Sequence, residues 1–263
     1  GLGAGIYEYN AAFEAKSNGT KPGYTGGKTF TEHSPYRIRI SEDGRIFVTA
    51  HDQAGEFLWE VNPDDLNEWT SVFKGATHNA AKLLDASGKF IAGTNAGFDV
   101  RGKGENLQLL MLSCDKLGTS SAVFQCHEYN LGTAKEWSTV PTKAFNGCQL
   151  HNSMIARYSQ VIYDKDGGFW CTYYINGTIL GGMAHFTKEG EKDFEKHSIP
   201  LRAGAICFNK DFSKVLIAGN DIYGTTKETA KAVVYAVSKD AAGKPELTKE
   251  TIIDMATVGG NLN

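Results

Sequence analysis

The chain lacks the features that mark membrane-spanning and nucleic-acid-binding proteins. No apolar run approaches the roughly eighteen residues needed to cross a bilayer. A formal net charge of −3 provides no basic footprint for nucleic acid. No signal peptide is visible, and the first residue is Gly1 rather than Met. We therefore expect no transmembrane segment and no nucleic-acid partner, and we expect a processed product or a segment of something longer.

Cysteine pairs and enzyme motifs are also missing. The 5 cysteines contain no CxxC pair, which excludes the common zinc motifs and a disulfide framework but leaves one disulfide open. The sequence has no G-x-S-x-G elbow, no P-loop and no H-E-x-x-H motif. Because no pair of carboxylates stands at a catalytic spacing either, the sequence favours a non-catalytic protein.

Glycine and aromatic residues are abundant, and they indicate β-structure. The 30 glycines, 14 phenylalanines and 11 tyrosines occur with few long amphipathic stretches, which is typical of an all-β chain. One pattern recurs four times, at 37–50, 82–94, 160–173 and 207–219. Each copy has two apolar segments around a short turn rich in Asp, Ser and Gly, which predicts a β-hairpin formed by strands A and B.

A second element follows these hairpins and completes a repeat. Residues 6–10, 58–62 and 126–130 share an aromatic-or-His, Glu, apolar, Asn pattern, with weaker copies at 183–187 and 233–238. We assign it to a strand C, followed by an outer polar strand D such as 69–74 or 247–254. Four antiparallel strands in a repeat of roughly 45–70 residues form the blade of a β-propeller. A β-sandwich is the alternative, but a sandwich requires no repeated strand order.

The number of repeats indicates whether the sequence covers a complete propeller. The chain opens on a strand C at 6–10 and stops at 259–263, where a new strand A would begin. We therefore predict a single propeller domain over 1–263, with four complete four-stranded blades plus part of another. Because such an arrangement leaves a sheet edge open, we expect residues to be missing at one or both ends, and five to seven blades in the full protein.

These motifs resemble known propeller families over most of the chain. The D-x-x-G hairpins followed by a Trp-Glu-Val-Asn-Pro strand at 59–63 are similar to NHL, YVTN and SMP-30-type propellers. They resemble still more the secreted or lipid-anchored propellers on the surface of Bacteroidota-type bacteria. The resemblance implies an extracellular or bacterial cell-surface location, including a lipid-anchored outer-membrane form. It names no activity, because one fold hosts many functions.

In a propeller, the D-to-A and B-to-C connections lie around one mouth of the central channel, where ligands are commonly bound. Four histidines fall in the predicted D-to-A connections, and Asn follows two of them. These residues are His33, His78, Asn79, His151, Asn152 and His197. They predict either a metal ring or polar ligand site, or four separate histidines that hydrogen-bond locally.

Arginines form a second group of candidate ligand-binding residues. Arg37 and Arg39 alternate with apolar residues, so both point to one side of a strand, and Arg157 and Arg202 stand near the starts of later A strands. Together they predict a cationic funnel for carboxylates or sulfated sugars, unless they pair with nearby acidic groups. Tyr223 is a candidate sugar platform because it stands in a predicted loop.

No cofactor is expected for a binding protein. An SMP-30-like lactonase would instead need an axial calcium at the channel mouth, since Ca²⁺ prefers oxygen ligands. Available oxygen ligands are Asp52, Asn79, Asn95, Asn152, Asn220 and Asp221. Two further segments, 96–121 and 141–154, appear as insertions on the functional face, although the apolar run 107–112 also fits an added packing strand.

From the sequence we predict a non-catalytic binding propeller on the cell surface or outside the cell. It would dock a glycan, a peptide or a protein partner on its D-to-A face. The alternatives are a metal-assisted hydrolase or lactonase that uses the same mouth, and a structural subunit of a larger surface assembly.

Overall fold

The computed structural model describes residues 33–52, 58–66, 68–72, 77–79, 82–84, 90–93, 97–114, 124–133, 143–145, 154–175, 180–220 and 230–254. Most of these residues form β-strands, and a single short 3₁₀ helix, η1 (Gly104–Asn106), occurs among them. No helix in these ranges is long and apolar enough to span a membrane. The chain is all-β, as its composition predicts.

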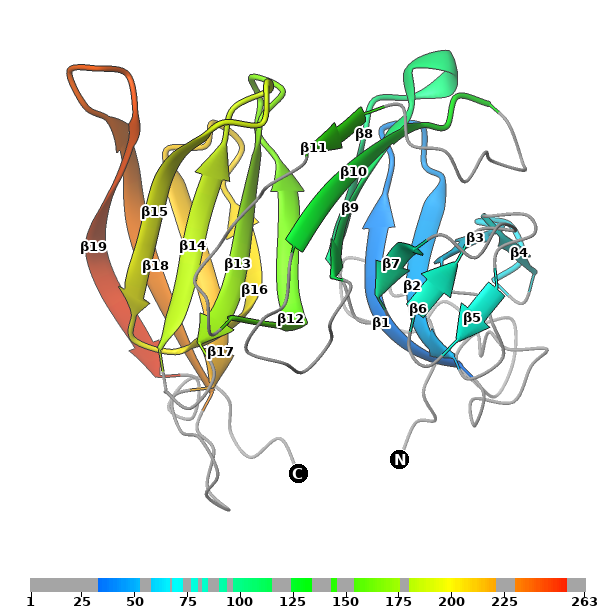
Figure 1. Cartoon of the computed structure of the whole chain (residues 1–263), viewed down its shortest axis with the longest axis horizontal. Helices are drawn as coiled ribbons and strands as arrows, with labels where there is room; N and C mark the ends of the chain where they lie inside the picture. The colour runs from blue at the N-terminus through cyan, green and yellow to red at the C-terminus, as the bar shows by residue number, and fades with distance from the viewer. Residues whose placement is uncertain are drawn as a thin grey trace. The chain divides into compact units, whose positions relative to one another are not determined.

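The described strands form four sheets of four strands and one sheet of three, and the strands of each sheet follow chain order (Figure 1). Sheet 1 contains β1 (His33–Ile40), β2 (Ile46–Asp52), β3 (Leu58–Val61) and β4 (Trp69–Ser71). Sheet 2 contains β5 (Thr77–Asn79), β6 (Lys82–Leu84) and β7 (Phe90–Gly93). Sheet 3 contains β8 (Phe98–Arg101), β9 (Gln108–Cys114), β10 (Phe124–Asn130) and β11 (Lys143–Phe145).

Sheet 4 contains β12 (Met154–Tyr163), β13 (Phe169–Ile175), β14 (Gly181–Phe186) and β15 (Lys192–Ile199). Sheet 5 contains β16 (Arg202–Phe208), β17 (Lys214–Asn220), β18 (Ala230–Lys239) and β19 (Pro245–Asp254). Four consecutive antiparallel strands in one sheet make a propeller blade. The predicted fold class, an all-β propeller with four-stranded blades, is therefore confirmed.

The four predicted hairpins are all present, as β1–β2, β6–β7, β12–β13 and β16–β17. In sheets 1 and 4 the A-to-B turn places a glycine at positive φ, 85° at Gly44 and 90° at Gly167. Glycine adopts this conformation without a steric penalty, which explains the recurrence of Gly in these turns. The Gly167 N–H donates to the carbonyl of Asp164 at 3.1 Å and closes the turn.

The division of the middle of the chain into blades was predicted incorrectly. The segment 96–121 contains β8 and β9, which share sheet 3 with β10 and β11, so the alternative of an added packing strand at 107–112 is confirmed and the insertion on the functional face is not. The strand C pattern at 126–130 therefore belongs to this sheet and not to the 82–94 hairpin, which pairs with β5 instead. The physical reason is burial, since Leu107 and the side chains of 109–112 are at most 1% exposed. The second presumed insertion, 141–154, contains β11.

The chain divides into two compact units, which are described separately. Unit 1 comprises residues 1–95, 100–109 and 128–142, and it includes sheets 1 and 2. Unit 2 comprises residues 96–99, 110–127 and 143–263, and it includes sheets 4 and 5. The predicted extra strand C at 6–10 lies outside the described residues.

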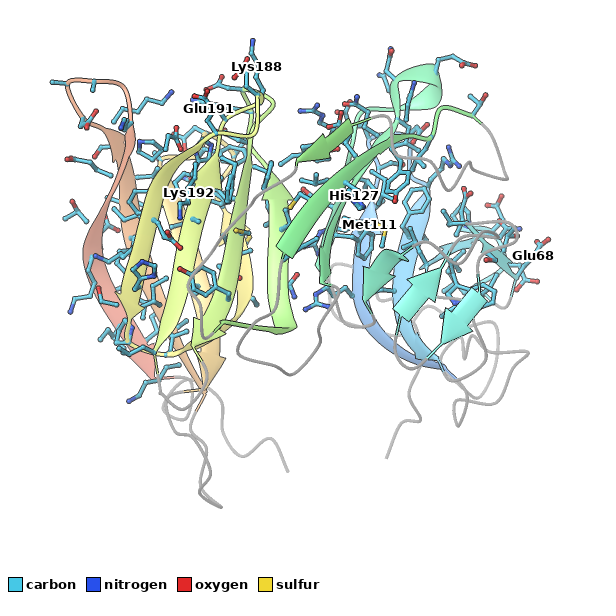
Figure 2. All side chains as sticks on the ribbon, in the orientation of Figure 1. Glu68, Met111, His127, Lys188, Glu191 and Lys192 are labelled. Carbon is cyan, nitrogen blue, oxygen red and sulfur yellow. The ribbon has the colours of Figure 1, made fainter. Side chains whose placement is uncertain are left out.

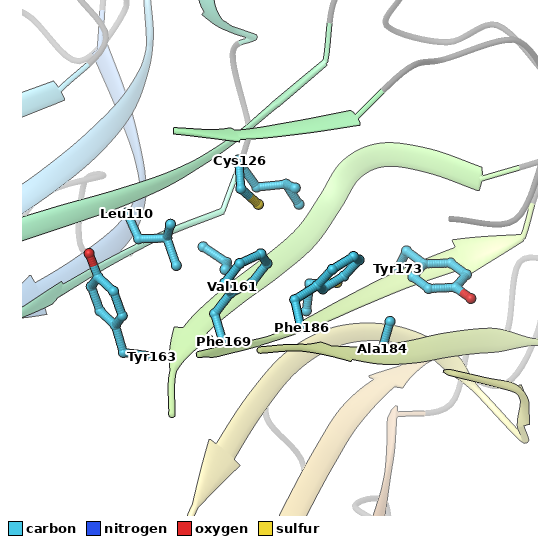
Figure 3. Packing of buried hydrophobic residues seen from close by; sticks show 10 residues of the cluster. Leu110, Cys126, Val161, Tyr163, Phe169, Tyr173, Ala184 and Phe186 are labelled. Carbon is cyan, nitrogen blue, oxygen red and sulfur yellow. The ribbon is translucent and has the colours of Figure 1, made fainter. Parts of the chain in front are cut away.

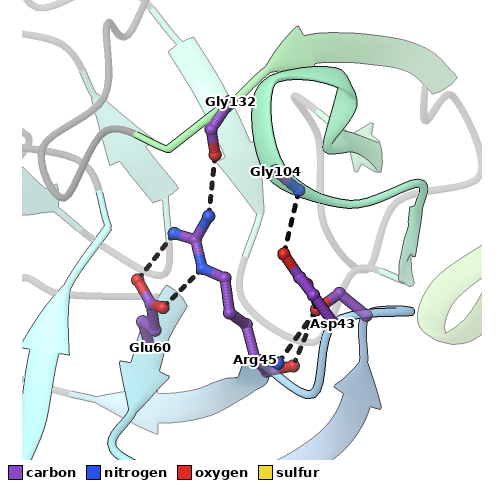
Figure 4. Close-up of polar contacts among 6 residues, drawn as sticks. Asp43, Arg45, Glu60, Gly104 and Gly132 are labelled. Carbon is purple, nitrogen blue, oxygen red and sulfur yellow. Dashed lines mark hydrogen bonds and ion pairs between the residues drawn. The ribbon is translucent and has the colours of Figure 1, made fainter.

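In unit 1, charged side chains connect the A-to-B turn of sheet 1 to loops that flank β9 and β10 (Figure 4). Arg45 binds both carboxylate oxygens of Glu60, with Nε–Oε1 at 2.7 Å and Nη2–Oε2 at 2.9 Å. Its Nη1 donates to the carbonyl of Gly132 at 2.7 Å. Asp43 Oδ2 accepts the N–H of Gly104 at 2.9 Å. The bidentate pair fixes the Arg45 side chain on sheet 1. The bonds from Arg45 to Gly132 and from Gly104 to Asp43 then attach the two loops to this turn.

In unit 2, apolar side chains cover both faces of sheet 4. We call the first face the one that bears Val161, Phe169 and Cys171; these residues cluster with Leu110 and Leu112 of β9 (Figure 3). The second face is the opposite one, and its Trp170 and Met183 cluster with the first face of sheet 5, formed by Ile206, Val215 and Ile217. Each fully buried apolar side chain of this size contributes about 1.5–3 kcal/mol to stability.

Candidate functional site

A cleft of about 540 Å³ lies between sheets 4 and 5, within unit 2. Its lining includes residues from the A-to-B and C-to-D turns of both sheets, so it lies at the end of the blades where these turns gather. Figure 2 shows Lys188, in the C-to-D turn of sheet 4, at this end of the sheet. A volume of this size is in the range of small-molecule sites.

The buried part of the cleft contains a histidine held between two carboxylates. His185 of β14 is 6% exposed, and its Nε2 lies 2.9 Å from Asp164 Oδ2 while its Nδ1 lies 2.6 Å from Asp193 Oδ1. Ionised carboxylates only accept hydrogen bonds, so both contacts are satisfied only by the doubly protonated imidazolium. The ring also lies against the indole of Trp170, with centroids 4.6 Å apart.

The pKa values of this group follow from the same geometry. Burial alone would lower the pKa of His185, but the hydrogen bonds and charges of Asp164 and Asp193 outweigh it and raise the pKa above 6.5. Burial likewise disfavours the charged form of Asp164, yet its hydrogen bond and ion pair with His185 lower its pKa below 3.8. The buried part of the cleft is therefore a charged, internally paired cluster.

A strained phenylalanine forms part of the apolar wall. Phe212 has φ of 59°, and no other described non-glycine residue has a positive φ. It closes the A-to-B turn of sheet 5, where its N–H donates to the carbonyl of Asn209 at 3.1 Å, as Gly167 does in sheet 4. A side chain in this conformation costs about 1–2 kcal/mol. The Phe212 ring stacks on Phe208 with centroids 4.8 Å apart, which holds it at the cleft.

The exposed part of the cleft carries charges of both signs. Lys239 of sheet 5 lies 3.6 Å from Asp166 of sheet 4, so an ion pair joins the two sheets here. Asp211 accepts hydrogen bonds from the Ser213 hydroxyl at 2.7 Å and from the Ser213 N–H at 3.1 Å, and these bonds lower the pKa of its carboxyl. The cleft therefore offers hydrogen-bond donors and acceptors in fixed positions, and its charges are not all of one sign.

The structure describes the side chains of three of the residues predicted to bind ligand. Arg37 and Arg39 lie on one face of β1, opposite Thr49 and Phe47 of β2, as their alternation predicts. Arg37 is buried at 8% exposure. The third, His197, is exposed and hydrogen-bonded within sheet 4. None of the three lines the cleft.

The remaining residues predicted to bind ligand have no described side chain. The structure gives a backbone position for some of them and does not describe the others. His33, His78, Asn79, Arg157 and Arg202 lie in β1, β5, β5, β12 and β16, and their side chains are outside the described part of the structure. His151, Asn152 and Tyr223 lie outside the described residues altogether. Their roles in ligand binding stay predictions.

Placing the histidines in D-to-A connections was wrong for three of the four. His33 pairs with Asp52, His78 pairs with Leu83, and His197 lies inside β15. The strand ladders extend further than the sequence pattern suggests, and only residues 200–201 separate β15 from β16. A connection this short cannot contain His197.

His197 belongs to a polar network on sheet 4. Its Nδ1 lies 2.8 Å from the hydroxyl of Tyr173, which donates to Glu195 Oε1 at 2.8 Å, and Lys192 binds the same carboxylate. Burial, followed by the bond to Glu195, raises the pKa of Tyr173 far above its ordinary value. The phenol therefore stays protonated and acts as a structural donor.

Two residues of the cleft were not identified from the sequence, although a signal for each is present. His185 occupies the position of strand C at which Glu60 stands in sheet 1, because both pair with the second residue of strand B. Phe212 occupies a turn position where Gly44 and Gly167 stand in sheets 1 and 4. In each case, an alignment of the repeats shows a residue type that differs from the one at the same position in other repeats.

No group of three or more His, Cys, Asp or Glu side chains in the described ranges is arranged to hold a metal ion. All six oxygen ligands proposed for an axial calcium are outside those ranges or have side chains that are not described, so the calcium hypothesis stays untested.

No protein-family model matches the sequence, and no curated protein matches it. Among solved structures, a protein from Lactobacillus plantarum matches with a TM-score of 0.50 and 10% identity, over 94% of this chain and 63% of that one. Hydrazine synthase from Kuenenia stuttgartiensis matches with a TM-score of 0.47 and 11% identity, over 82% and 66%. The β-propeller domain of Cps50 from Myceliophteria thermophila matches with a TM-score of 0.43 and 8% identity, over 84% and 59%.

The likeness to the Lactobacillus plantarum protein shows the fold alone. The chain spans less than two thirds of the length of each of these three structures. Their activities and partners are therefore not carried over to this chain.

Proposed function

We propose that the chain is a non-catalytic binding propeller and that the cleft between sheets 4 and 5 binds a saccharide. The observation that supports this most is the balance of charge in the cleft. Its lining has five carboxylates against three lysines and the imidazole of His185, so the net charge is close to zero when His185 is protonated. A strongly charged ligand would meet its own sign at close range in such a site.

A neutral, hydroxyl-rich ligand fits this chemistry. Sugar hydroxyls both donate and accept, so they can bond to carboxylates such as Asp211 and to ammonium groups such as Lys165. The C–H face of a sugar ring packs against aromatic and aliphatic surface, which Phe212, Val237 and Pro245 provide here. The strain stored at Phe212 also supports a functional role, because such outliers cluster at ligand sites.

A glycan array followed by calorimetry tests the proposal. For a saccharide that binds, Phe212→Ala removes the aromatic surface and should raise Kd about tenfold, the equivalent of about 1.4 kcal/mol. Ile252→Ala is the matched control, because Ile252 is an exposed apolar residue of sheet 5 outside the cleft, and it should leave Kd unchanged. Absence of saccharide binding, or equal affinities for wild type and Phe212→Ala, would refute the assignment.

The wider proposal follows the sequence resemblance. We propose an NHL, YVTN or SMP-30-like propeller that acts outside the cell or on a bacterial surface, including a lipid-anchored form. Docking of a peptide or protein on the D-to-A face remains a second mode of the same binding role. Ligand binding that survives a chelator supports the binding module. A stoichiometric bound metal would instead favour a metal-assisted hydrolase or lactonase.

A further inference from the structure

The buried imidazole of His185 connects two parts of sheet 4 that both line the cleft. Its Nε2 contacts Asp164, which begins the A-to-B turn between β12 and β13, and its Nδ1 contacts Asp193 of β15. Trp170 packs against the ring, and a Cβ placed on Gly168 would lie 3.2 Å from Nε2, so the turn passes close to the ring. His185 therefore holds the turn and the outer strand in one arrangement around itself.

The two contacts of His185 require two protons on the ring. A neutral imidazole has one N–H, and ionised carboxylates only accept hydrogen bonds, so loss of a proton deprives either Asp164 or Asp193 of this donor. The two carboxylate side chains are only 12% and 20% exposed, so water reaches them poorly. A buried carboxylate that loses its charged partner is costly, and it lowers that cost by moving toward solvent. Loss of the proton therefore rearranges the wall of the cleft.

The A-to-B turn transmits this change to the exposed part of the cleft. The backbone N–H of Asp164 donates to the Gly168 carbonyl at 2.9 Å and so closes the turn. Lys165 and Asp166 follow in the same turn and line the cleft, and Asp166 pairs with Lys239 of sheet 5. A displacement of Asp164 therefore moves charged groups of the cleft. Five carboxylates of the lining then face three cations instead of four.

His185 is the only histidine among the described residues that line the cleft. The other charged groups there are carboxyl and ammonium groups, which ordinarily titrate near pH 4 and above about pH 10. They are Asp164, Lys165, Asp166, Lys188, Glu189 and Asp193 on sheet 4, and Asp211 and Lys239 on sheet 5, while β13 contributes the uncharged Trp170. Burial opposes the charged form of His185, but the bonds and charges of its two carboxylates outweigh burial and raise its pKa above 6.5.

We propose that protonation of His185 switches on saccharide binding in this cleft, so that the protein binds in mildly acidic solution and releases its saccharide in alkaline solution. This inference rests on the proposed saccharide site. A neutral saccharide does not itself titrate, so the pH dependence comes from the protein. In the neutral state the saccharide would cover a carboxylate that has lost its partner, and this cost opposes binding. The apparent Kd therefore rises as the protonated fraction of His185 falls.

NMR and calorimetry on the full chain compare the switch with binding. A pH titration of the imidazole signals gives the midpoint of His185, whose signal is identified by its absence in His185→Gln. A glycan array probed near pH 5.5 selects a neutral saccharide, and calorimetry measures its Kd up to about pH 9.5. Kd should rise at least about tenfold, beginning at the pH at which His185 titrates. By reciprocity, saturation with this saccharide should raise the His185 midpoint by about one pH unit.

Three variants separate the switch from a structural role. His185→Gln should bind with a Kd that hardly varies with pH. Asp193→Asn keeps the imidazole but removes one of its carboxylates, so both the His185 midpoint and the loss of saccharide binding should move to lower pH. Glu250→Gln is the matched control, because Glu250 lies outside the cleft and pairs with Lys214. It should leave both midpoints as they are in wild type.

The outcomes distinguish this inference from the saccharide site on which it rests. Saccharide binding with a Kd that is constant across this pH range would overturn the switch and leave the binding site in place. A pH dependence retained in His185→Gln, or a midpoint that Asp193→Asn does not lower, would also overturn the switch. Absence of saccharide binding at every pH would refute both proposals.

Discussion

At the residue scale, the candidate site consists of substitutions within a repeating framework. His185 stands where sheet 1 has Glu60, and Phe212 stands where sheets 1 and 4 have glycine in the turn. Glu60 pairs with Arg45 on the same sheet, whereas His185 recruits Asp164 and Asp193. Residues that break a local rule and remain in place are expected at functional sites, because the strain or buried charge must be compensated by their surroundings.

The stability of the fold should depend on the protonation of His185. Its pKa is raised in the folded state, so its contribution is complete below the unfolded pKa of about 6.5 and is lost as the pH rises through the folded pKa. Asp164 acts in the opposite sense, and its contribution is lost as the pH falls through its folded value, which lies below 3.8. The pair is therefore most stabilising in mildly acidic solution.

His185→Gln should lower the free energy of unfolding by about 1–3 kcal/mol near pH 6, since it removes a charged donor between two carboxylates. The difference from wild type should shrink in alkaline solution, where the wild-type imidazole is neutral. Urea unfolding at a series of pH values measures this difference. Lys188→Gln, which removes an exposed charge of the same cleft, is the control and should show a small loss that hardly varies with pH. A loss for His185→Gln that stays constant with pH would contradict the charged-cluster interpretation.

At the element scale, the conformation of a hairpin turn and its attachment to neighbouring segments depend on different forces. Turn positions are set locally by backbone conformation, as at Gly44 and Gly167. The attachment of a turn to its neighbours depends on specific side chains, and in sheet 1 Arg45 makes three hydrogen bonds with Glu60 and Gly132. The side chains of Arg45 and Glu60 are only about a fifth exposed, so water competes weakly for these hydrogen bonds.

Arg45→Lys should therefore destabilise the chain although it keeps the charge. Lysine cannot reproduce the planar fork, so we expect a loss of about 1–2 kcal/mol in the free energy of unfolding. Lys214→Arg is the matched control, because the Lys214–Glu250 pair is more exposed and such pairs contribute little. Denaturant unfolding of both variants measures the contrast. Equal stability of Arg45→Lys and wild type would show that the bidentate geometry contributes nothing.

At the scale of the whole molecule, stability should be distributed unevenly among the blades. In unit 2, side chains cover both faces of sheet 4, whereas the second face of sheet 5 has exposed apolar residues. We predict that amide hydrogen exchange is slowest in β13 and β14 and faster in β19, an outer strand with mostly exposed side chains. Exchange followed by mass spectrometry tests this order. Protection in β19 equal to that in β13 would contradict it.

The sequence predicts the order of strands within a blade better than it predicts which strands belong to the same blade. The four hairpins are short-range patterns, and they were confirmed, as was a strand C after the hairpins of sheets 1, 4 and 5. The assignment of 126–130 to the 82–94 hairpin was wrong. The local pattern of β10 is equally compatible with pairing to that hairpin and with pairing to β9. Burial of Leu107 and of the 109–112 run decides between them, and burial is a property of the assembled sheets.

The sequence by itself determined that this protein is built of four-stranded antiparallel blades, because alternation and turn chemistry are encoded within about fifty consecutive residues. Only the tertiary structure decided which strands share a sheet, that the histidines at 33, 78 and 197 lie in strands, and that a cleft forms between sheets 4 and 5. The reason is that Asp164, His185 and Phe212 meet through the packing of two sheets. No local pattern in the chain records that proximity.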